Sequence, residues 1–225
     1  MDIGIFGATG VIGSRAVAEA TQRGHRVTAF SRDAARFPGD WGKVAWQVAD
    51  WLDADSIAAA IAGVDVVISA VNAGHGIADT IAKAGDFVVG AQAMVSALEQ
   101  HPRVRVIAVG GAGSLEIAPG RQLVDTGAAF IRTLTDDLEV PAEYIEVVRA
   151  LRSALNVYRL SNRHWTYLSP SSGRVVPGAR TGRFRVGGDQ VLGGDGDISA
   201  EDLAVALLDE VEQPRFIQRR FTVGY

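Results

Sequence analysis

Three glycines near the start of the chain, Gly7, Gly10 and Gly13, are the residues whose type and spacing most clearly indicate chemistry. They stand between an apolar stretch, residues 3–6, that predicts a strand and residues 11–20, which predict a helix. In such a unit the first glycine permits a tight turn, the second lets the backbone approach a pyrophosphate, and the third lets the helix pack on the strand. The N–H groups and positive dipole end of the helix then face the phosphates. A glycine-rich stretch alone is often a simple turn, but this order of elements predicts a dinucleotide site formed by Gly7, Thr9, Gly10, Val11, Ile12 and Gly13.

The end of the second predicted strand, residues 26–30, should decide which dinucleotide binds. A site for NAD carries an acid here for the ribose 2′-hydroxyl, whereas an arginine suits the 2′-phosphate of NADP. The strand runs into Ser31 and Arg32, and Arg36 follows one helical turn later. Because a guanidinium holds a phosphate through two hydrogen bonds, these residues favour NADP(H) over NAD(H). Two observations leave the alternative open: Asp33 supplies an acid one residue late, and Arg32 could be an ordinary solvated arginine.

The alternation of strand and helix patterns predicts the fold class and the domain organisation. Further strands are predicted at residues 43–49, 64–71, 104–109, 165–168 and 221–225, with a short one near Phe184 and Val186. Helices are predicted at residues 53–62, capped by Asp53, and at 77–98, 142–162 and 199–211, the last capped by Ser199. We therefore expect one α/β domain over residues 1–225, a doubly wound, mostly parallel sheet of the Rossmann type.

The loops that leave the carboxyl ends of these strands carry the remaining site candidates, since open α/β sheets bind ligands there. Asp50 and Trp51 would lie beside the adenine, although a loop acid and a half-buried indole explain the pair equally well. His75, between two glycines, is the histidine best placed for proton transfer, or it is a solvated loop residue. Ser114, after strand 104–109, either holds a substrate oxygen or caps the next turn.

Residues 115–141 show no clear strand pattern but contain the apolar pairs Leu123-Val124 and Phe130-Ile131. Long insertions in compact domains are often functional, so the segment could fold over the cleft as a lid. The alternative is a helical excursion that completes the core.

Composition excludes several classes of function. The net charge is −4, and 22 basic residues are spread among 26 acidic ones, which argues against a nucleic-acid-binding face. There is no cysteine, hence no disulfide, thiol nucleophile or thiolate metal site. Because no apolar run reaches membrane-spanning length and no basic leader is visible, we expect a cytoplasmic protein that acts on a small molecule, without a metal, nucleic acid or membrane. The oligomeric state is open.

Several motifs together resemble the NAD(P)H-binding family of atypical short-chain dehydrogenases/reductases, which includes flavin reductase (biliverdin reductase B) and nitrogen-metabolite regulators. They are Gly-Ala-Thr-Gly-Val-Ile-Gly at 7–13, Ser31-Arg32, Val-Gly-Gly-Ala-Gly-Ser-Leu-Glu at 109–116, Trp-Thr-Tyr-Leu-Ser-Pro at 165–170 and Ile-Ser-Ala-Glu-Asp-Leu-Ala at 198–204. The resemblance spans nearly the whole chain. It implies further cofactor contacts at Gly110 and Gly111, and it places Ala70, Val71, Ser169 and Pro170 beside the nicotinamide half.

One departure from that family bears on catalysis. Its best-known members use a Tyr-x-x-x-Lys pair, but here Tyr144 meets Val148, and the chain's two lysines are Lys43 and Lys83. Without a nearby ammonium, the Tyr144 phenol should keep a pKa of about 10 and transfer protons poorly at neutral pH. Two hypotheses remain: an NADPH-dependent reductase that works without this pair, using Ser114, His75 or Tyr144, or a non-catalytic protein that senses NADP(H). The sequence does not identify a substrate.

Overall fold

The computed structural model describes residues 1–39, 42–194 and 196–225. Within them an eight-stranded sheet has the order β10-β12-β8-β5-β4-β1-β2-β3. The strands are β1 Asp2–Phe6, β2 Arg26–Ser31, β3 Ala45–Val48, β4 Val66–Ser69, β5 Arg105–Val109, β8 Trp165–Pro170, β10 Arg185–Gly187 and β12 Arg219–Gly224. Neighbouring strands run parallel except for β10, which lies antiparallel to β12. The mostly parallel sheet is therefore confirmed.

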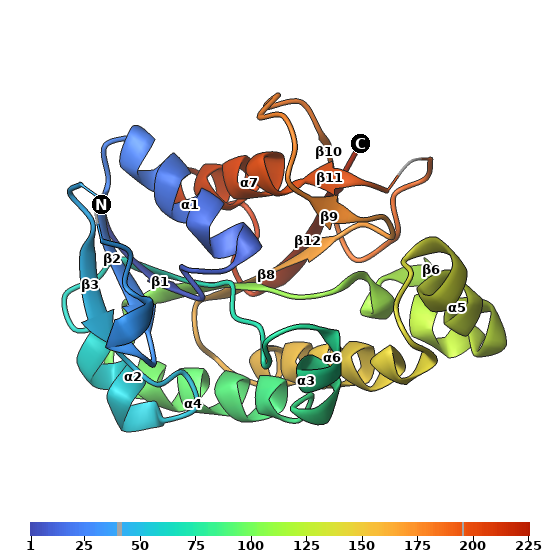
Figure 1. Cartoon of the computed structure of the whole chain (residues 1–225), viewed down its shortest axis with the longest axis horizontal. Coiled ribbons are helices and arrows are strands. Elements are labelled where there is room, and N and C mark those ends of the chain that lie inside the picture. The colour runs from blue at the N-terminus through green and yellow to red at the C-terminus, as the bar shows by residue number, and fades with distance from the viewer. Residues whose placement is uncertain (40–41, 195) are drawn as a thin grey trace.

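Helices cover both faces of the sheet (Figure 1). On one face lie α1 (Val11–Gln22) and α7 (Ala200–Glu212), which pack against each other. On the other lie α2 (Ala54–Ala60), α4 (Asp86–Gln100) and α6 (Ile145–Arg159). Every residue of β4 is buried, as expected for a parallel strand covered on both sides. This double covering confirms the doubly wound Rossmann-like fold.

The order of connections determines where a ligand can enter. From β1 the chain moves outward through β2 to the edge strand β3, then returns to β4 on the other side of β1. The loops that follow β1 and β4 therefore diverge from adjacent strands. Such a divergence opens a crevice at the carboxyl edge of the sheet.

Two helix starts have the caps that the sequence predicts. Asp53 accepts a hydrogen bond from the Ser56 N–H at 2.7 Å and begins α2. Ser199 accepts one from the Asp202 N–H at 3.0 Å and begins α7. Each cap satisfies a backbone donor that has no partner inside the helix. None of the helices in the described part of the chain is long and apolar enough to cross a membrane.

The predicted helix at residues 77–98 is wrong as a single element. The chain forms α3 (Ile77–Ala82) and then α4, with a break at residues 83–85. There the Ala84 and Asp86 N–H groups donate to carbonyls three residues back, those of Ile81 and Lys83. Gly85 lies in this break, and glycine is among the poorest helix formers.

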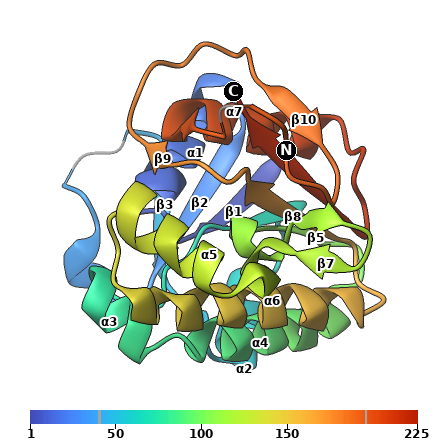
Figure 2. The same cartoon turned by 90° about the vertical axis from the view of Figure 1, so that its right-hand side faces the viewer.

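Residues 115–141 form a small subdomain at one end of the molecule (Figure 2). It contains a short hairpin of β6 (Glu116–Ala118) and β7 (Arg121–Gln122), which the sequence pattern did not predict, followed by α5 (Ala128–Arg132) and a π-helical turn over Thr133–Asp137. Val124, Phe130 and Leu134 are buried against Val148 of α6 in a cluster of their own. The segment thus packs on α6 rather than on the large sheet.

The turn-rich stretch at residues 177–182 is held to the helices α1 and α7 by acidic side chains. Asp202 Oδ1 accepts hydrogen bonds from the Thr181 and Gly182 N–H groups, both at 2.8 Å. Glu19 of α1, which is only 4% exposed, pairs with Arg180 at 2.7 Å and with Arg23 at 2.8 Å. The hydrogen bonds from Arg180 and Arg23 lower the pKa of Glu19.

Candidate functional site

The turn after β1 needs glycine at two of its three glycine positions for reasons of packing. Gly7 has φ +76°, and a Cβ there would lie 2.2 Å from the Ala70 carbonyl oxygen at the end of β4. A Cβ on Gly13 would lie 2.1 Å from the Gly7 carbonyl oxygen. Both glycines therefore let the turn, α1 and β4 approach closely, as the sequence spacing predicts for Gly7 and Gly13.

Gly10 differs from the other two because a Cβ there would make one tight contact instead of overlapping backbone atoms. It is exposed and extended, with φ −82° and ψ 174°, and a Cβ there would meet Gly7 O at 3.2 Å. Gly10 is also the N-cap of α1, and the Ser14 N–H donates to its carbonyl at 3.0 Å. This is the first hydrogen bond of the helix, so the N–H groups of Val11, Ile12 and Gly13 have no acceptor within α1. Free N–H groups at a helix N-terminus are the arrangement that binds phosphate.

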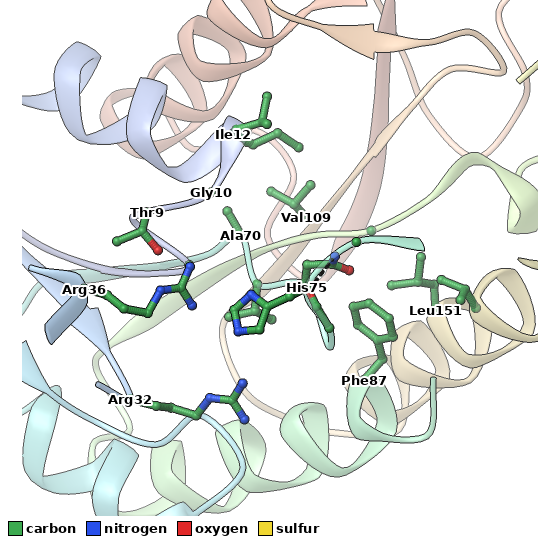
Figure 3. A pocket seen from close by; sticks show the side chains of 18 of the residues that line it. Thr9, Gly10, Ile12, Arg32, Arg36, Ala70, His75, Phe87, Val109 and Leu151 are labelled. Carbon is green, nitrogen blue, oxygen red and sulfur yellow. Dashed lines mark hydrogen bonds between the residues drawn. The ribbon is translucent and has the colours of Figure 1, made fainter. Parts of the chain in front are cut away.

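A cavity of about 470 Å³ opens beside this turn, between the loops that follow β1 and β4. We call it the cofactor cleft. Its wall contains Gly7, Thr9, Gly10, Val11, Ile12, Arg32, Arg36, Ala70, Val71, His75, Gly110 and Tyr144, which the sequence singled out, together with Asn72, Gly74, Gly76, Phe87, Val109, Val147 and Leu151. Figure 3 shows that the side chains of Arg32, Arg36 and His75 point into the same space. The structure thus brings together residues from six separate stretches of sequence.

Two cationic side chains stand at one end of the cofactor cleft. Arg32 and Arg36 are exposed, and within the described residues neither guanidinium group has a hydrogen bond or an ion pair. Asp33, the competing acid, uses its carboxylate to accept a hydrogen bond from the Ala35 N–H at 2.8 Å, capping the turn Ala34–Arg36. The Ser31 hydroxyl donates to the Asp33 carbonyl at 3.1 Å. The two guanidinium groups are therefore free to bind an anion, whereas the Asp33 carboxylate is already engaged as the cap of this turn.

The loop after β4 is ordered by Asn72. Its amide donates to the Gly74 carbonyl at 3.1 Å and to Thr80 Oγ1 at 2.9 Å, and Thr80 in turn donates to Gly76 O at 2.7 Å. The His75 N–H donates to Asp79, so the exposed imidazole is held over the cleft by its own backbone. Asn72 was not predicted from the sequence. Its position three residues after the buried strand β4 was the signal available for it.

Of the two residues expected near the adenine, Trp51 and Asp50, one reaches the cleft region. Trp51 is 7% exposed and packs on Phe87, and it lines a small recess that adjoins Ser31, Arg32 and Arg36. The Asp50 carboxylate instead accepts a hydrogen bond from the Leu52 N–H at 3.0 Å and lines neither this recess nor the cleft. An adenine contact through the Asp50 side chain therefore gains no support from the geometry.

Tyr144 lies at the start of α6, in the wall of the cofactor cleft, and is partly buried. Burial raises the pKa of its phenol above the usual value. Arg149 pairs with Glu146 at 2.8 Å, and Arg152 pairs with Asp125 at 2.9 Å, so these two arginines on the same helix are engaged elsewhere. The phenol is thus a poorer proton donor at neutral pH than the sequence alone implies.

Ser114 and Ser169 are buried away from the cofactor cleft. Ser114 is 3% exposed, and its hydroxyl accepts a hydrogen bond from the buried Arg220 at 2.9 Å. Ser169 is fully buried between the neighbouring strands β5 and β12. Neither residue lines the cleft, so the geometry gives no support to a substrate contact at Ser114 or a nicotinamide contact at Ser169.

A second cavity, of about 550 Å³, adjoins the cleft, and we call it the side cavity. The two cavities share Ile12, Gly110, Tyr144 and Leu151. The sequence prediction placed Gly111 and Pro170 at the cofactor, and the structure places both in the wall of the side cavity. The rest of its wall comes from residues 112–138, from Val148 and from residues 171–175 and 197. No sequence pattern signals this assembly, because its parts are far apart in the chain.

The described part of the chain contains no group of three or more His, Asp or Glu side chains arranged to hold a metal ion.

Comparisons with known proteins agree with this geometry. Residues 7–214 match a protein family described as NAD(P)H-binding. The uncharacterized protein YwnB of Bacillus subtilis is 35% identical over 230 residues, which cover 99% of this chain and 98% of YwnB. A solved structure from Burkholderia pseudomallei, described as a putative exported protein, is 43% identical, with a TM-score of 0.82 and full coverage of both chains. A Streptococcus pneumoniae structure described as a putative NADH-flavin reductase is 26% identical, with a TM-score of 0.78, covering 100% of this chain and 99% of that one.

Proposed function

The chain belongs to the NAD(P)H-binding family, and from that premise we propose that it is an NADPH-dependent oxidoreductase that reduces a small molecule. The observation that carries the proposal is the cofactor cleft itself. The cleft lies where the order of strand connection reverses, between β1 and β4, and next to the N–H groups of the first turn of α1. A solved structural neighbour described as a putative NADH-flavin reductase supports the reaction class.

When bound, NADPH supplies a hydride, so that NADPH, a proton and the oxidised substrate give NADP⁺ and the reduced substrate. The residues of this chain would contribute binding and orientation. The Val11 and Ile12 N–H groups would hold the pyrophosphate, and Ala70 and Val71 would line the nicotinamide half. We propose that the proton comes from water or from His75, since burial keeps the pKa of Tyr144 high.

The proposed preference for NADPH over NADH rests on Arg32 and Arg36. Both guanidinium groups line the cleft without partners in the described residues, whereas Asp33, the acid that could accept from a 2′-hydroxyl, is engaged with Ala35. A free guanidinium beside a 2′-phosphate adds a charge-assisted hydrogen bond that NADH cannot form.

Calorimetric titration of NADPH and NADH into the wild type and the Arg32→Ala variant tests this preference. A hydrogen bond to a charged group contributes about 1.5–3 kcal/mol, so the variant should bind NADPH about 10- to 100-fold more weakly. Its affinity for NADH should change little. Arg103→Ala is the matched control, because Arg103 is an exposed arginine far from the cleft. Equal affinities of the wild type for NADPH and NADH would refute the preference.

A second function, a non-catalytic sensor of NADP(H), is favoured by one observation. Tyr144 has no activating cation in the described part of the chain, and burial raises its pKa. A sensor would bind NADPH without oxidising it. NADPH consumption in the presence of small electron acceptors separates the two functions, since only the oxidoreductase would consume the cofactor.

Cell fractionation tests the cytoplasmic location, which stays a prediction.

A further inference from the structure

The side cavity adjoins the cofactor cleft but does not include Gly7, Thr9 or Gly10 of the turn after β1. We propose that it is the substrate pocket and that it selects an uncharged, largely apolar carbonyl compound about the size of two fused six-membered rings. This inference rests on the proposed function, because it assigns the substrate of the same reaction. The carbonyl carbon accepts the hydride, and its oxygen takes a proton from water or from His75, which gives the alcohol while NADPH becomes NADP⁺.

The side cavity lies beside the cofactor cleft and has the volume of a small-molecule site. The side cavity shares four wall residues with the cofactor cleft, so a molecule inside it lies next to whatever occupies the cleft. Its volume of about 550 Å³ falls within the range of about 300–1,000 Å³ that small-molecule sites occupy. The cavity is therefore large enough for a ring system and is close to the chemistry.

The chemical nature of the wall limits the substrate to apolar compounds. Its large aliphatic and aromatic side chains include Ile12, Leu123, Phe130, Leu134, Leu138, Val148 and Leu151. Phe130 and Leu134 are 6% and 1% exposed, so their packing is already fixed. Apolar walls favour ligands that bury apolar surface and disfavour charged groups, which lose their hydration.

The charged groups of the wall also disfavour anions. They are the carboxylates of Asp137 and Asp197 and the guanidinium of Arg174. The Arg174 guanidinium donates to the Asp137 carbonyl at 3.0 Å and pairs with Glu139 at 3.3 Å. The backbone N–H of Arg174 donates to Asp197 Oδ1 at 2.6 Å. The cation is thus already paired, and a carboxylate or sulfonate ligand would also meet the carboxylate of Asp137.

One polar residue in the wall suits a carbonyl oxygen. Ser171 is fully buried, its N–H donates to the Val223 carbonyl at 2.8 Å, and its hydroxyl has no partner within the described residues. A buried hydroxyl without a partner costs about 1–3 kcal/mol, and a ligand oxygen would remove that cost. Ser171 is therefore the residue that we assign to the substrate oxygen.

The test is calorimetric binding of two probes to the protein with and without saturating NADP⁺, which cannot supply a hydride. The probes are the neutral 2-methyl-1,4-naphthoquinone and the anionic 1,4-naphthoquinone-2-sulfonate. We expect the neutral probe to bind at least tenfold more tightly. Equal affinities, or tighter binding of the sulfonate, would overturn the proposed selectivity.

Two pairs of variants locate the binding. Thr133 lines the side cavity, whereas Thr135, two residues later, is exposed and does not. Thr133→Phe should fill the cavity and weaken the neutral probe at least tenfold, while Thr135→Phe should leave its affinity unchanged. Ser171→Ala should weaken the probe about threefold to tenfold. Thr222→Val removes another fully buried hydroxyl without a partner, outside the cavity, and should leave the affinity unchanged.

Each failure has a separate meaning. If NADP⁺ does not bind in the same titrations, the proposed function is refuted, and the unloaded protein still tests the pocket. If the neutral probe binds Thr133→Phe as well as the wild type, the side cavity is not its site. If Ser171→Ala and Thr222→Val behave alike, the assignment of Ser171 to the substrate oxygen is wrong.

Discussion

Valine at position 10 should abolish cofactor binding in a folded protein, whereas alanine at position 13 should weaken the fold. The conformation of Gly10 is open to any residue, and a Cβ there meets one carbonyl oxygen at 3.2 Å. The loss of a glycine N-cap costs less than about 1 kcal/mol. A branched side chain would, however, occupy the space of the pyrophosphate. If two hydrogen bonds to charged oxygens are lost, at about 1.5–3 kcal/mol each, the Kd for NADPH should rise more than about 100-fold.

Gly13→Ala should instead lower the stability of the fold. Its Cβ would lie 2.1 Å from the carbonyl oxygen and 2.6 Å from the carbonyl carbon of Gly7, both backbone atoms that cannot rotate away. Overpacking of this kind costs about 3 kcal/mol, and alanine recovers about 1 kcal/mol over glycine within a helix. At about 2–4 °C per kcal/mol for a chain of this size, the Tm should fall by about 4–8 °C.

Thermal unfolding and calorimetric titration of NADPH on both variants check this contrast. We expect a near-native Tm with lost binding for Gly10→Val, and a lowered Tm for Gly13→Ala. Wild-type affinity in a folded Gly10→Val protein would refute the placement of the pyrophosphate at this turn. An unchanged Tm for Gly13→Ala would show that the close approach to Gly7 is not required.

Three further substitutions test catalysis and stability. Tyr144→Phe should keep the NADPH oxidation rate within about threefold, because the phenol's high pKa makes it a poor acid; a loss of about 10²-fold or more would show that it transfers the proton. His75→Ala should slow the same steady-state reaction more than Tyr144→Phe does, and the reverse order would exclude the imidazole as donor. Glu19→Gln should lower the free energy of unfolding by about 1–3 kcal/mol at pH 7, since Arg180 and Arg23 lose a buried carboxylate. The folded pKa of Glu19 lies below its unfolded value, so its stabilisation is present above about pH 4.3 and is lost as the pH falls through the folded pKa; urea unfolding should show the wild type and variant converging in acid.

The sequence predicts the parts of the site that depend on local geometry. A turn between β1 and α1 with glycine at positions 7, 10 and 13 has few alternatives, so the spacing predicts the tight turn, the helix start and the close packing of the helix on the strand. Arg32 and Arg36 could be assigned in the same way, since they follow directly from the end of β2. The sequence could not show that Asp33 caps the next turn, because an aspartate at this position is equally compatible with a capping role and with a free carboxylate.

The parts that depend on distant residues could not be derived from the sequence. Ser114 looked accessible at the end of β5, but Arg220, 106 residues later, covers it with a hydrogen bond. The side cavity likewise joins Phe130 and Leu134 to Pro170 and Arg174, and no local pattern fixes how two such segments meet. The break at residues 83–85 was missed for a different reason, since the apolar spacing continues through it while the backbone does not.

The separate packing of residues 115–141 has a consequence for amide hydrogen exchange. Three of the buried side chains in its small cluster, those of Val124, Phe130 and Leu134, belong to the segment itself, and one, that of Val148, belongs to α6. A unit with so little buried apolar surface should open cooperatively, at a free energy well below that of global unfolding. Its amides should therefore exchange together and before those of β1, β4 and β5. Because Phe130 and Leu134 also line the side cavity, a ligand held there should slow that exchange, so the local opening equilibrium reports occupancy.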